Sequence, residues 1–264
     1  MTDAAPARPT RPAASAAPRG AEPTAAGLRA ALAARADPEL AVGVARFFQT
    51  GPGQYGEGDV FVGLKVPVIR QLIRPFGALP PIELDALLDS AVHEHRLAAL
   101  LVLVGQFDRA GAAGGRDDTE RDRLAAFYLS AVRRGRVNNW DLVDCSAPTL
   151  VGAYLFDRPR DVMFALAASD SLWERRVAMV GSLGLIMRGD ATTTLELAAR
   201  LLGDRESLMH KAVGWMLREV GKRIERALLL GFLDEYAARM PRTALSYATE
   251  HLDPAVRAAY RARR

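Results

Sequence analysis

Apolar side chains recur at steps of three and four residues along most of this chain, and no segment shows the strict alternation of a half-buried strand. The pattern is clearest in six segments: 39–48, 82–92, 96–107, 123–132, 190–202 and 227–240. Short breaks with Pro, Gly or Asp separate them. The spacing therefore predicts an all-α protein. The one long interruption, 108–120, is predicted to be a flexible loop between helices.

A weak internal repeat accompanies this pattern. Three of the expected helices open on a polar–basic pair followed by small and large apolar residues: 95-HRLAALLVL-103, 175-RRVAMVGSL-183 and 210-HKAVGWMLR-218. Their spacing, with 138–148 near the middle of the wider gap, fits a period of about 35–45 residues, which is typical of HEAT and armadillo solenoids. Stacked helix pairs would place the equivalent basic positions along one concave surface.

The two ends of the chain differ in composition. Residues 1–27 contain five prolines and almost no large apolar side chain. Such a segment cannot bury enough surface to offset its ordering entropy, so a disordered tail is expected there and a single folded domain over 28–264. The beginning lacks the apolar core of a secretory signal, and no run approaches the roughly 18 apolar residues of a membrane span. These features predict a cytoplasmic protein without membrane contact.

Charge and cysteine content narrow the classes of partner and cofactor. The formal charge of +4 permits a nucleic-acid partner without requiring one, and lysine occurs only at 65, 211 and 222, so the positive charge is mostly arginine. One cysteine excludes an intramolecular disulfide framework and a Cys-rich zinc site. The four histidines suggest no ligand set, so neither a metal nor another cofactor is expected.

Two local features have ordinary explanations. The stretch 51-GPGQYG-56 matches G-x-G-x-x-G, but an expected helix precedes it and an acidic loop follows, so it is not a dinucleotide fingerprint. Its glycines are expected to shape an ordered loop before a helix that starts at Pro67. Cys145 has no nearby histidine base in the sequence, which favours a small core residue over a nucleophile.

Each of the three tryptophans has an ionisable partner at helical spacing. Trp140 precedes Asp144 by four residues, and Trp173 precedes Arg176 by three. Trp215 stands in a basic stripe made of Lys211, Arg218 and Lys222. Aromatic and basic side chains on one face suit phosphates on either side of a sugar or base. The spacing alone favours the ordinary explanation, in which the tryptophans are core residues and the charges form a solvated rim. Likewise, a helix begun by Asn138 or Asn139 explains Asp141 and Asp144, because carboxylates are favourable at its positive end.

Taken together, 138-NNWDLVD-144, 172-LWERR-176 and 210-HKAVGWMLREVGKR-223 resemble the AlkD-like DNA alkylation repair family. The resemblance runs from about residue 40 to 260. The loop 51–67 and the tail 240–250 look like one bacterial branch of that family. The resemblance implies an all-α, right-handed α-α superhelix of HEAT-like repeats. It also implies a monomeric DNA glycosylase of the cytoplasm and nucleoid, acting on double-stranded DNA that contains alkylated purines.

The same resemblance assigns roles to individual residues. It implies Trp140, Asp144 and Trp215 as catalytic, with Arg176 and Arg218 on phosphates. The basic–aromatic spacing adds Lys211, Lys222 and Trp173 to the expected DNA-binding set. An N-terminal aromatic, tyrosine in well-known members of the family, falls here near Phe47 or Phe48, with several loop residues inserted after it.

The implied reaction is excision of purines alkylated at N7 or N3. Such a purine is cationic and already a good leaving group, so a carboxylate at Asp144 would stabilise the oxocarbenium-like sugar electrostatically. Two other hypotheses stay open at this point. One is a catalytically silent repeat protein that binds unusual DNA structures, and the other is a scaffold for protein partners.

Overall fold

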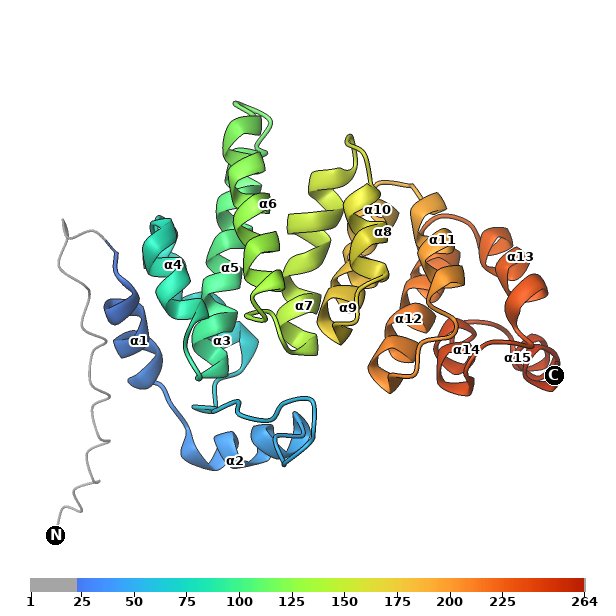
Figure 1. Ribbon diagram of the computed structural model, residues 1–264, viewed down its shortest axis with the longest axis horizontal. Helices are drawn as coiled ribbons and strands as arrows, with labels where there is room; N and C mark the ends of the chain where they lie inside the picture. Colours follow the sequence, from blue (N-terminus) through green and yellow to red (C-terminus); the bar gives the residue numbers. More distant parts are fainter. Residues whose placement is uncertain (1–22, 264) are drawn as a thin grey trace, which may run out of the picture.

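The fold is a file of helices stacked side by side, from α1 at the N-terminal end to α15 at the C-terminal end (Figure 1). The structure is a computed structural model, and it describes residues 23–263. The helices are α1 Ala25–Ala33, α2 Pro38–Phe47, α3 Val66–Leu72, α4 Pro81–Leu88, α5 His93–Ala110, α6 Asp118–Arg133, α7 Trp140–Ala147, α8 Asp161–Ala167, α9 Leu172–Gly181, α10 Leu183–Ile186, α11 Thr192–Arg200, α12 Ser207–Arg223, α13 Arg226–Tyr236, α14 Arg242–Ala248 and α15 Pro254–Ala262. A 3₁₀ turn, η1, spans Arg74–Phe76, and a π-helical segment, η2, spans Pro148–Ala153.

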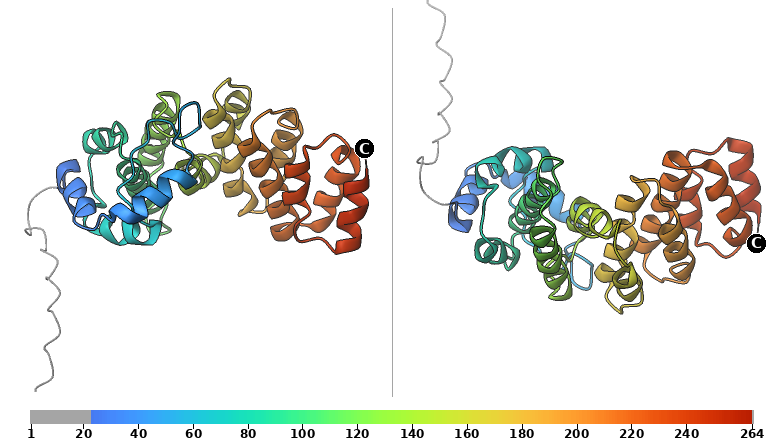
Figure 2. Two further views of the ribbon diagram at one scale, coloured as in Figure 1. Left: turned by 90° about the horizontal axis from the view of Figure 1, so that it is seen from below. Right: turned by 90° about the horizontal axis from the view of Figure 1, so that it is seen from above.

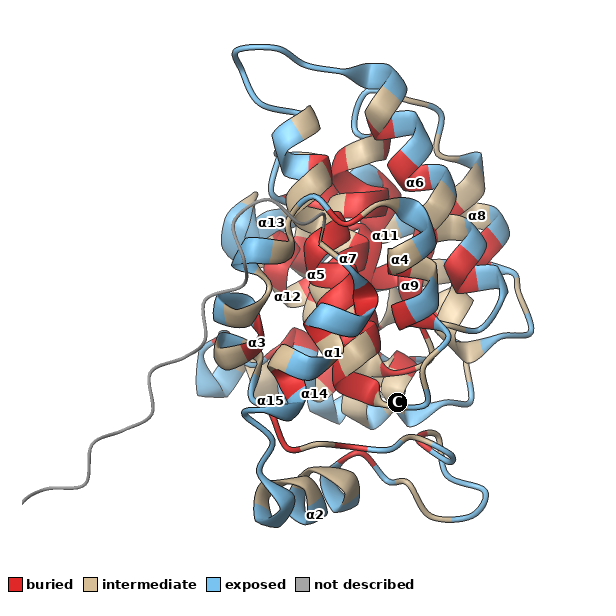
Figure 3. Cartoon of the chain, turned by 90° about the vertical axis from the view of Figure 1, so that its left-hand side faces the viewer, coloured by how far each residue is buried: buried red, intermediate tan, exposed pale blue. Residues whose placement is uncertain are grey.

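The helices form two layers that can be followed in the further views of Figure 2. In one layer α5, α7, α9, α12 and α14 make a continuous row, each packed on the next. In the other layer α4, α6, α8, α11 and α13 each pack on a member of that row. Buried residues lie between the layers, and Figure 3 shows their segments of the chain in red. Because one helix pair cannot bury its apolar faces alone, the core is continuous along the stack.

This architecture confirms the predicted all-α class. The described residues contain no β-strand, and the bridge between Val60 and Val92 is an isolated one. The stacking of helices in chain order is that of a helical repeat solenoid. It explains the sequence pattern, because most of the helices turn an apolar stripe toward the core.

The expected loop over 108–120 is wrong at both ends. Helix α5 continues to Ala110, and α6 already begins at Asp118. Asp117 is the N-cap of α6, and its carboxylate accepts a hydrogen bond from the Glu120 backbone at 3.0 Å. Acidic residues in the first turn of α6 add a favourable interaction with the helix dipole. The polar stretch that looked like loop is therefore partly a helix start.

The expected boundary between tail and domain, at residues 27 and 28, is also displaced. Helix α1 begins at Ala25, where the Thr24 side chain accepts a hydrogen bond from the Gly27 backbone at 3.1 Å. The Ala25 N–H donates to Glu83 at 2.6 Å, which ties α1 to α4. Residues 24–27 thus belong to the folded part, while the rest of the predicted tail, 1–22, lies outside the described residues.

At η2 the backbone approaches the next helices very closely. Pro148 has no N–H to donate to the preceding turn, and the chain continues as a π-helical turn. A Cβ added at Gly152 would lie 2.0 Å from the Gly181 carbonyl oxygen, and one added at Gly184 would lie 2.0 Å from that of Pro148. Backbone therefore packs directly on backbone here, and only glycine fits at either position.

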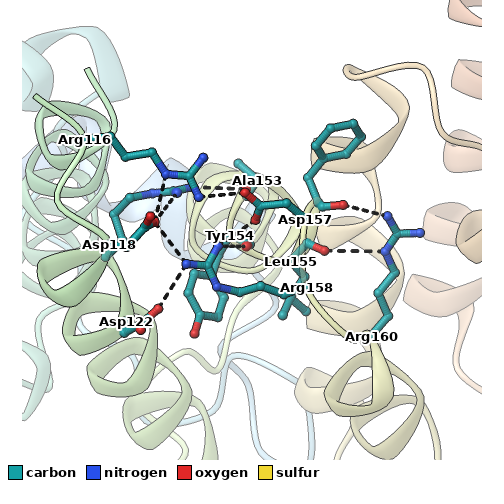
Figure 4. Close-up of polar contacts among 11 residues, drawn as sticks. Arg116, Asp118, Asp122, Ala153, Tyr154, Leu155, Asp157, Arg158 and Arg160 are labelled. Atoms are coloured by element: carbon teal, nitrogen blue, oxygen red, sulfur yellow. Dashed lines mark hydrogen bonds and ion pairs between the residues drawn. The ribbon is translucent and has the colours of Figure 1, made fainter. Parts of the chain in front are cut away.

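An exposed ionic cluster joins the start of α6 to the segment after η2 (Figure 4). Arg116 donates to Asp118 at 2.8 Å and to Asp157 at 2.6 Å. Arg158 donates to Asp118 at 3.0 Å, Asp122 at 3.3 Å and Asp157 at 2.6 Å. The arginines hold the pKa of Asp118 at about 2. The cluster links neighbouring helices along the edge of the stack that lies opposite the start of α7.

Candidate active site

The candidate site is built on the first two turns of α7. Asn139 is the N-cap of this helix, and its side-chain oxygen accepts a hydrogen bond from the Trp140 backbone N–H at 2.8 Å. Trp140 and Asp144 lie one turn apart on the same face, and both side chains are partly buried. The sequence signature W-x-x-x-D is therefore placed by a well-capped helix start.

Asp144 is held by a bidentate ion pair with Arg176 of α9. The Arg176 Nε lies 3.1 Å from one carboxylate oxygen, and Nη2 lies 3.0 Å from the other. The side chain of Asp144 is 19% exposed. Burial raises the pKa of Asp144, and the neighbouring Arg176 guanidinium only partly offsets this effect. The result is a fixed carboxylate with part of its surface open.

The structure gives Arg176 a different place from the expected contact with phosphate. Its side chain is 5% exposed. Besides Asp144 it binds the Leu208 carbonyl oxygen, with Nη1 donating at 2.6 Å. A guanidinium that is buried and bound on three nitrogens does not present its charge to a ligand. Arg176 instead ties α7, α9 and the start of α12 together around Asp144.

The N-terminal aromatics both reach Trp140. Phe48 stacks on the indole with a centroid distance of 5.0 Å and an interplanar angle of 7°. Phe47 meets the same indole edge-on at 5.9 Å. Phe48 is buried, whereas Phe47 is 67% exposed. Of the two expected candidates, Phe47 therefore offers an aromatic surface to a ligand, and Phe48 supports Trp140 from behind.

A buried polar network lies next to this aromatic stack. His93 of α5 bridges two carboxylates, with Nδ1 3.2 Å from Asp59 and Nε2 2.8 Å from Asp141. Asp59 also accepts from Arg96 at 2.5 Å and from the Asn139 amide at 3.1 Å. Burial alone would lower the pKa of His93, but the hydrogen bonds to Asp141 and Asp59 raise it. The two carboxylates thus stabilise the protonated imidazole against the effect of burial.

This network also changes the interpretation of Asp141. The sequence suggested a carboxylate that merely favours the positive end of a helix. Asp141 does lie in the first turn of α7, but it is 7% exposed and bound to His93, which is 48 residues earlier in the chain. The sequence carried no signal for this pairing, because 48 residues separate His93 from Asp141.

Trp173 lies at the start of α9, partly buried. Its ring meets that of Tyr55, in the loop after α2, at 6.1 Å and an angle of 72°. Tyr55 was not among the predicted site residues. The loop that carries it lies beneath the stack in Figure 1, together with α2.

The predicted basic stripe follows α12. Lys211 and Lys222 are exposed, and Trp215 is partly buried. Arg218 forms ion pairs with Glu250 and with Glu219, the latter at 3.2 Å. The structure thus brings the stripe onto the same row of helices as α7 and α9, with its two lysines open to solvent.

Other candidate chemistry is not supported. Burial and the nearby Asp141 raise the pKa of the Cys145 thiol to about 11, which is unfavourable for a nucleophile. Among residues 23–263, no group of three His, Cys, Asp or Glu side chains is placed to hold a metal ion. Within the same residues, no helix combines the length and apolar character that crossing a membrane requires.

Known proteins give a consistent comparison. The family model described as "DNA alkylation repair enzyme" matches residues 28–252. A solved structure, described as a predicted DNA alkylation repair enzyme from Enterococcus faecalis, superposes with a TM-score of 0.63 at 17% sequence identity. The similarity covers 83% of this chain and 97% of that one, and at this identity it shows the fold alone. No curated protein matches the chain. The match of the family model over most of its length shows that the chain belongs to the DNA alkylation repair enzyme family.

Proposed function

We propose that this protein is a monofunctional DNA glycosylase that hydrolyses the N-glycosidic bond of purines made cationic by alkylation at N7 or N3. Family membership supports the broader role in repair of alkylated DNA. The observation that carries the finer proposal is Asp144, a carboxylate fixed by Arg176 beside Trp140 and still partly exposed.

The chemistry asks little more than a well-placed negative charge. A cationic purine leaves readily, and positive charge then develops on the sugar as the bond lengthens. A carboxylate that is already in position stabilises that charge without reorganisation and can orient an attacking water. Arg176 favours the ionised form of Asp144, because it opposes the rise in the pKa of this carboxyl that burial causes.

Aromatic and basic side chains would hold the damaged strand at this carboxylate. Trp140 and Trp215 offer faces that attract a cationic nucleotide, and the exposed Phe47 extends this surface. The exposed Lys211 and Lys222 would contact phosphates, and Trp173 lies on the neighbouring helix α9. Arg218 can contribute only if it exchanges Glu250 for a phosphate.

The decisive measurement is release of 7-methylguanine and 3-methyladenine from methylated duplex DNA under single-turnover conditions. The purified protein is expected to release them, and Asp144→Asn to reduce the rate by about 10²–10³-fold. Binding to the duplex should hold or tighten, because the repulsion between carboxylate and phosphate is removed.

Asp161→Asn is the matched control, since Asp161 is an exposed carboxylate in the first turn of α8. It should excise at the parent rate. If the parent protein binds methylated duplex yet releases no base, the protein is a DNA-binding member without glycosylase activity. If Asp144→Asn excises as fast as the parent protein, Asp144 has only a structural role.

A further inference from the structure

The loop between α2 and α3 has a defined conformation and is attached to residues around Trp140. Gln49, Gly53 and Gly58 have positive φ values of 53°, 72° and 85°. The Gly51 N–H donates to Gln54 at 2.9 Å, and the Gly53 N–H donates to Glu57 at 2.8 Å. These bonds within residues 49–59 make a compact loop, and we call it the Tyr55 loop.

The Tyr55 loop is anchored at its end by the buried network. Asp59 binds Arg96 and His93 of α5 and the side chain of Asn139. Asn139 is the N-cap of α7, and His93 also binds Asp141. The end of the loop therefore holds the residues on both sides of Trp140.

Just beyond the Tyr55 loop, Glu94 of α5 fixes the chain. Its buried carboxylate accepts hydrogen bonds from the backbone N–H groups of Val62, Gly63 and Leu64, at 2.8–3.1 Å. Val60 and His93 complete the attachment, with the His93 N–H donating to the Val60 carbonyl oxygen at 2.8 Å. The segment after the Tyr55 loop is thus hydrogen-bonded to α5, which packs against α7.

The middle of the loop is linked to Trp140 through Phe47. The Tyr55 hydroxyl donates to the Phe47 carbonyl oxygen at 3.4 Å, next to the ring that meets Trp140 edge-on. The Tyr55 ring also contacts Trp173 of α9 edge-on at 6.1 Å. Burial raises the pKa of the Tyr55 hydroxyl, and the Trp140 indole N–H, a hydrogen-bond donor beside it, acts in the opposite direction.

We propose that Tyr55 is a positioning residue, which fixes the indole of Trp140 against Phe48 and spans the gap to Trp173. This inference rests on the proposed glycosylase function, because the position of Trp140 matters through the sugar that it contacts. Two independent attachments support it: Asp59 binds Asn139, the N-cap of α7, and Tyr55 binds the main chain of Phe47, whose ring contacts Trp140. Small displacements at such a site cost large factors in rate.

The test compares Tyr55→Phe, which keeps the ring and loses the hydroxyl, with the parent protein. Single-turnover excision of 7-methylguanine is expected to slow by about tenfold. The Kd for undamaged duplex should change less than about twofold, since a positioning residue adds no phosphate contact. Tyr154→Phe is the control. Tyr154 lies after η2 beside Arg158 of the ionic cluster, at the edge of the stack opposite the start of α7.

A second readout follows Trp140 without requiring activity. In a background of Trp173→Phe and Trp215→Phe, Trp140 is the remaining tryptophan, and its emission should change when Tyr55→Phe is added. Unchanged emission or an unchanged excision rate overturns the inference. A weakened Kd with unchanged emission also overturns it, in favour of direct DNA contact. If emission changes but the parent protein releases no base, the glycosylase proposal fails while the effect of Tyr55 on Trp140 stands.

Discussion

At the scale of single residues, the charge of Asp144 depends on a balance between burial and one arginine. Burial raises the pKa of this carboxyl and Arg176 lowers it. Catalysis through the carboxylate requires the ionised form, so the rate should fall on the acid side as Asp144 takes up a proton.

In the Arg176→Gln variant the rate should begin to fall at a higher pH than in the parent protein. The substitution removes the positive charge that lowers the pKa of Asp144, while it keeps a hydrogen-bond donor. The measurement is the single-turnover excision rate as a function of pH on the acid side of neutrality. Arg175→Gln is the control, since Arg175 is the preceding residue and binds Asp204 at 2.6 Å instead. If the rate of the Arg176→Gln variant falls at the same pH as that of the parent protein, Arg176 does not set the pKa of Asp144.

The spacing of residues predicted part of this site and could not predict the rest. Trp140 and Asp144 are found together because one helical turn separates them, a relation that any helix preserves. The partner of Asp144 is 32 residues away, so the buried place of Arg176 was out of reach. Tyr55 was missed for a similar reason, because its contact with Trp173 depends on the path of an irregular loop.

At the scale of elements, His93 joins the Tyr55 loop to α5 and α7. Its pKa is raised in the folded protein, despite burial and the nearby Arg96, because Asp141 and Asp59 hydrogen-bond to the imidazole. The stabilisation by protonated His93 is therefore complete below the unfolded pKa of about 6.5 and is lost as the pH rises through the folded value.

Comparing thermal unfolding of the parent protein and His93→Gln from pH 6 to 9 tests this. The parent protein should have the higher Tm at pH 6, and the gap should narrow by about 2–4 °C at high pH, the shift that roughly 1 kcal/mol produces at this size. His210→Gln is a control, because His210 binds the Asp204 carbonyl oxygen and no carboxylate. A constant gap would mean that protonated His93 adds nothing to stability.

The positions of the helices could largely be predicted from the apolar periodicity, since most helices bury an apolar stripe in the stack. Element ends followed less well. The polar residues 117–120 resemble a loop in composition but form the capped start of α6. Likewise, Ala25 carries no strong apolar signal, yet it is buried against the rest of the chain. Caps and small buried residues act through specific contacts that an apolar pattern does not record.

At the scale of the whole molecule, the proposed DNA surface extends over the row α7, α9 and α12, so affinity should depend on charges far from Asp144. Lys211→Gln and Lys222→Gln should each weaken binding to any duplex and lower the slope of log Kd against log salt by about 0.9 per lost phosphate contact. The base released should not change.

Arg200→Gln is the matched control for this surface. Arg200 is an exposed cation of α11, in the other layer, where it pairs with Glu196 at 2.5 Å. Its replacement is expected to leave the salt slope at the parent value. If the lysine variants also keep that slope, the basic stripe on α12 does not contact the DNA backbone.

The contact of η2 with Gly181 and Gly184 has a mechanical consequence. Here η2, which follows α7, packs backbone against backbone at Gly152, so the distance to Gly181 and Gly184 is set largely by main-chain geometry. A methyl group at Gly152 would have to turn the C-terminal repeats relative to α7. The distance between Trp140 and Trp215 would thus be altered from the core, while every residue of the proposed DNA surface stays as it is.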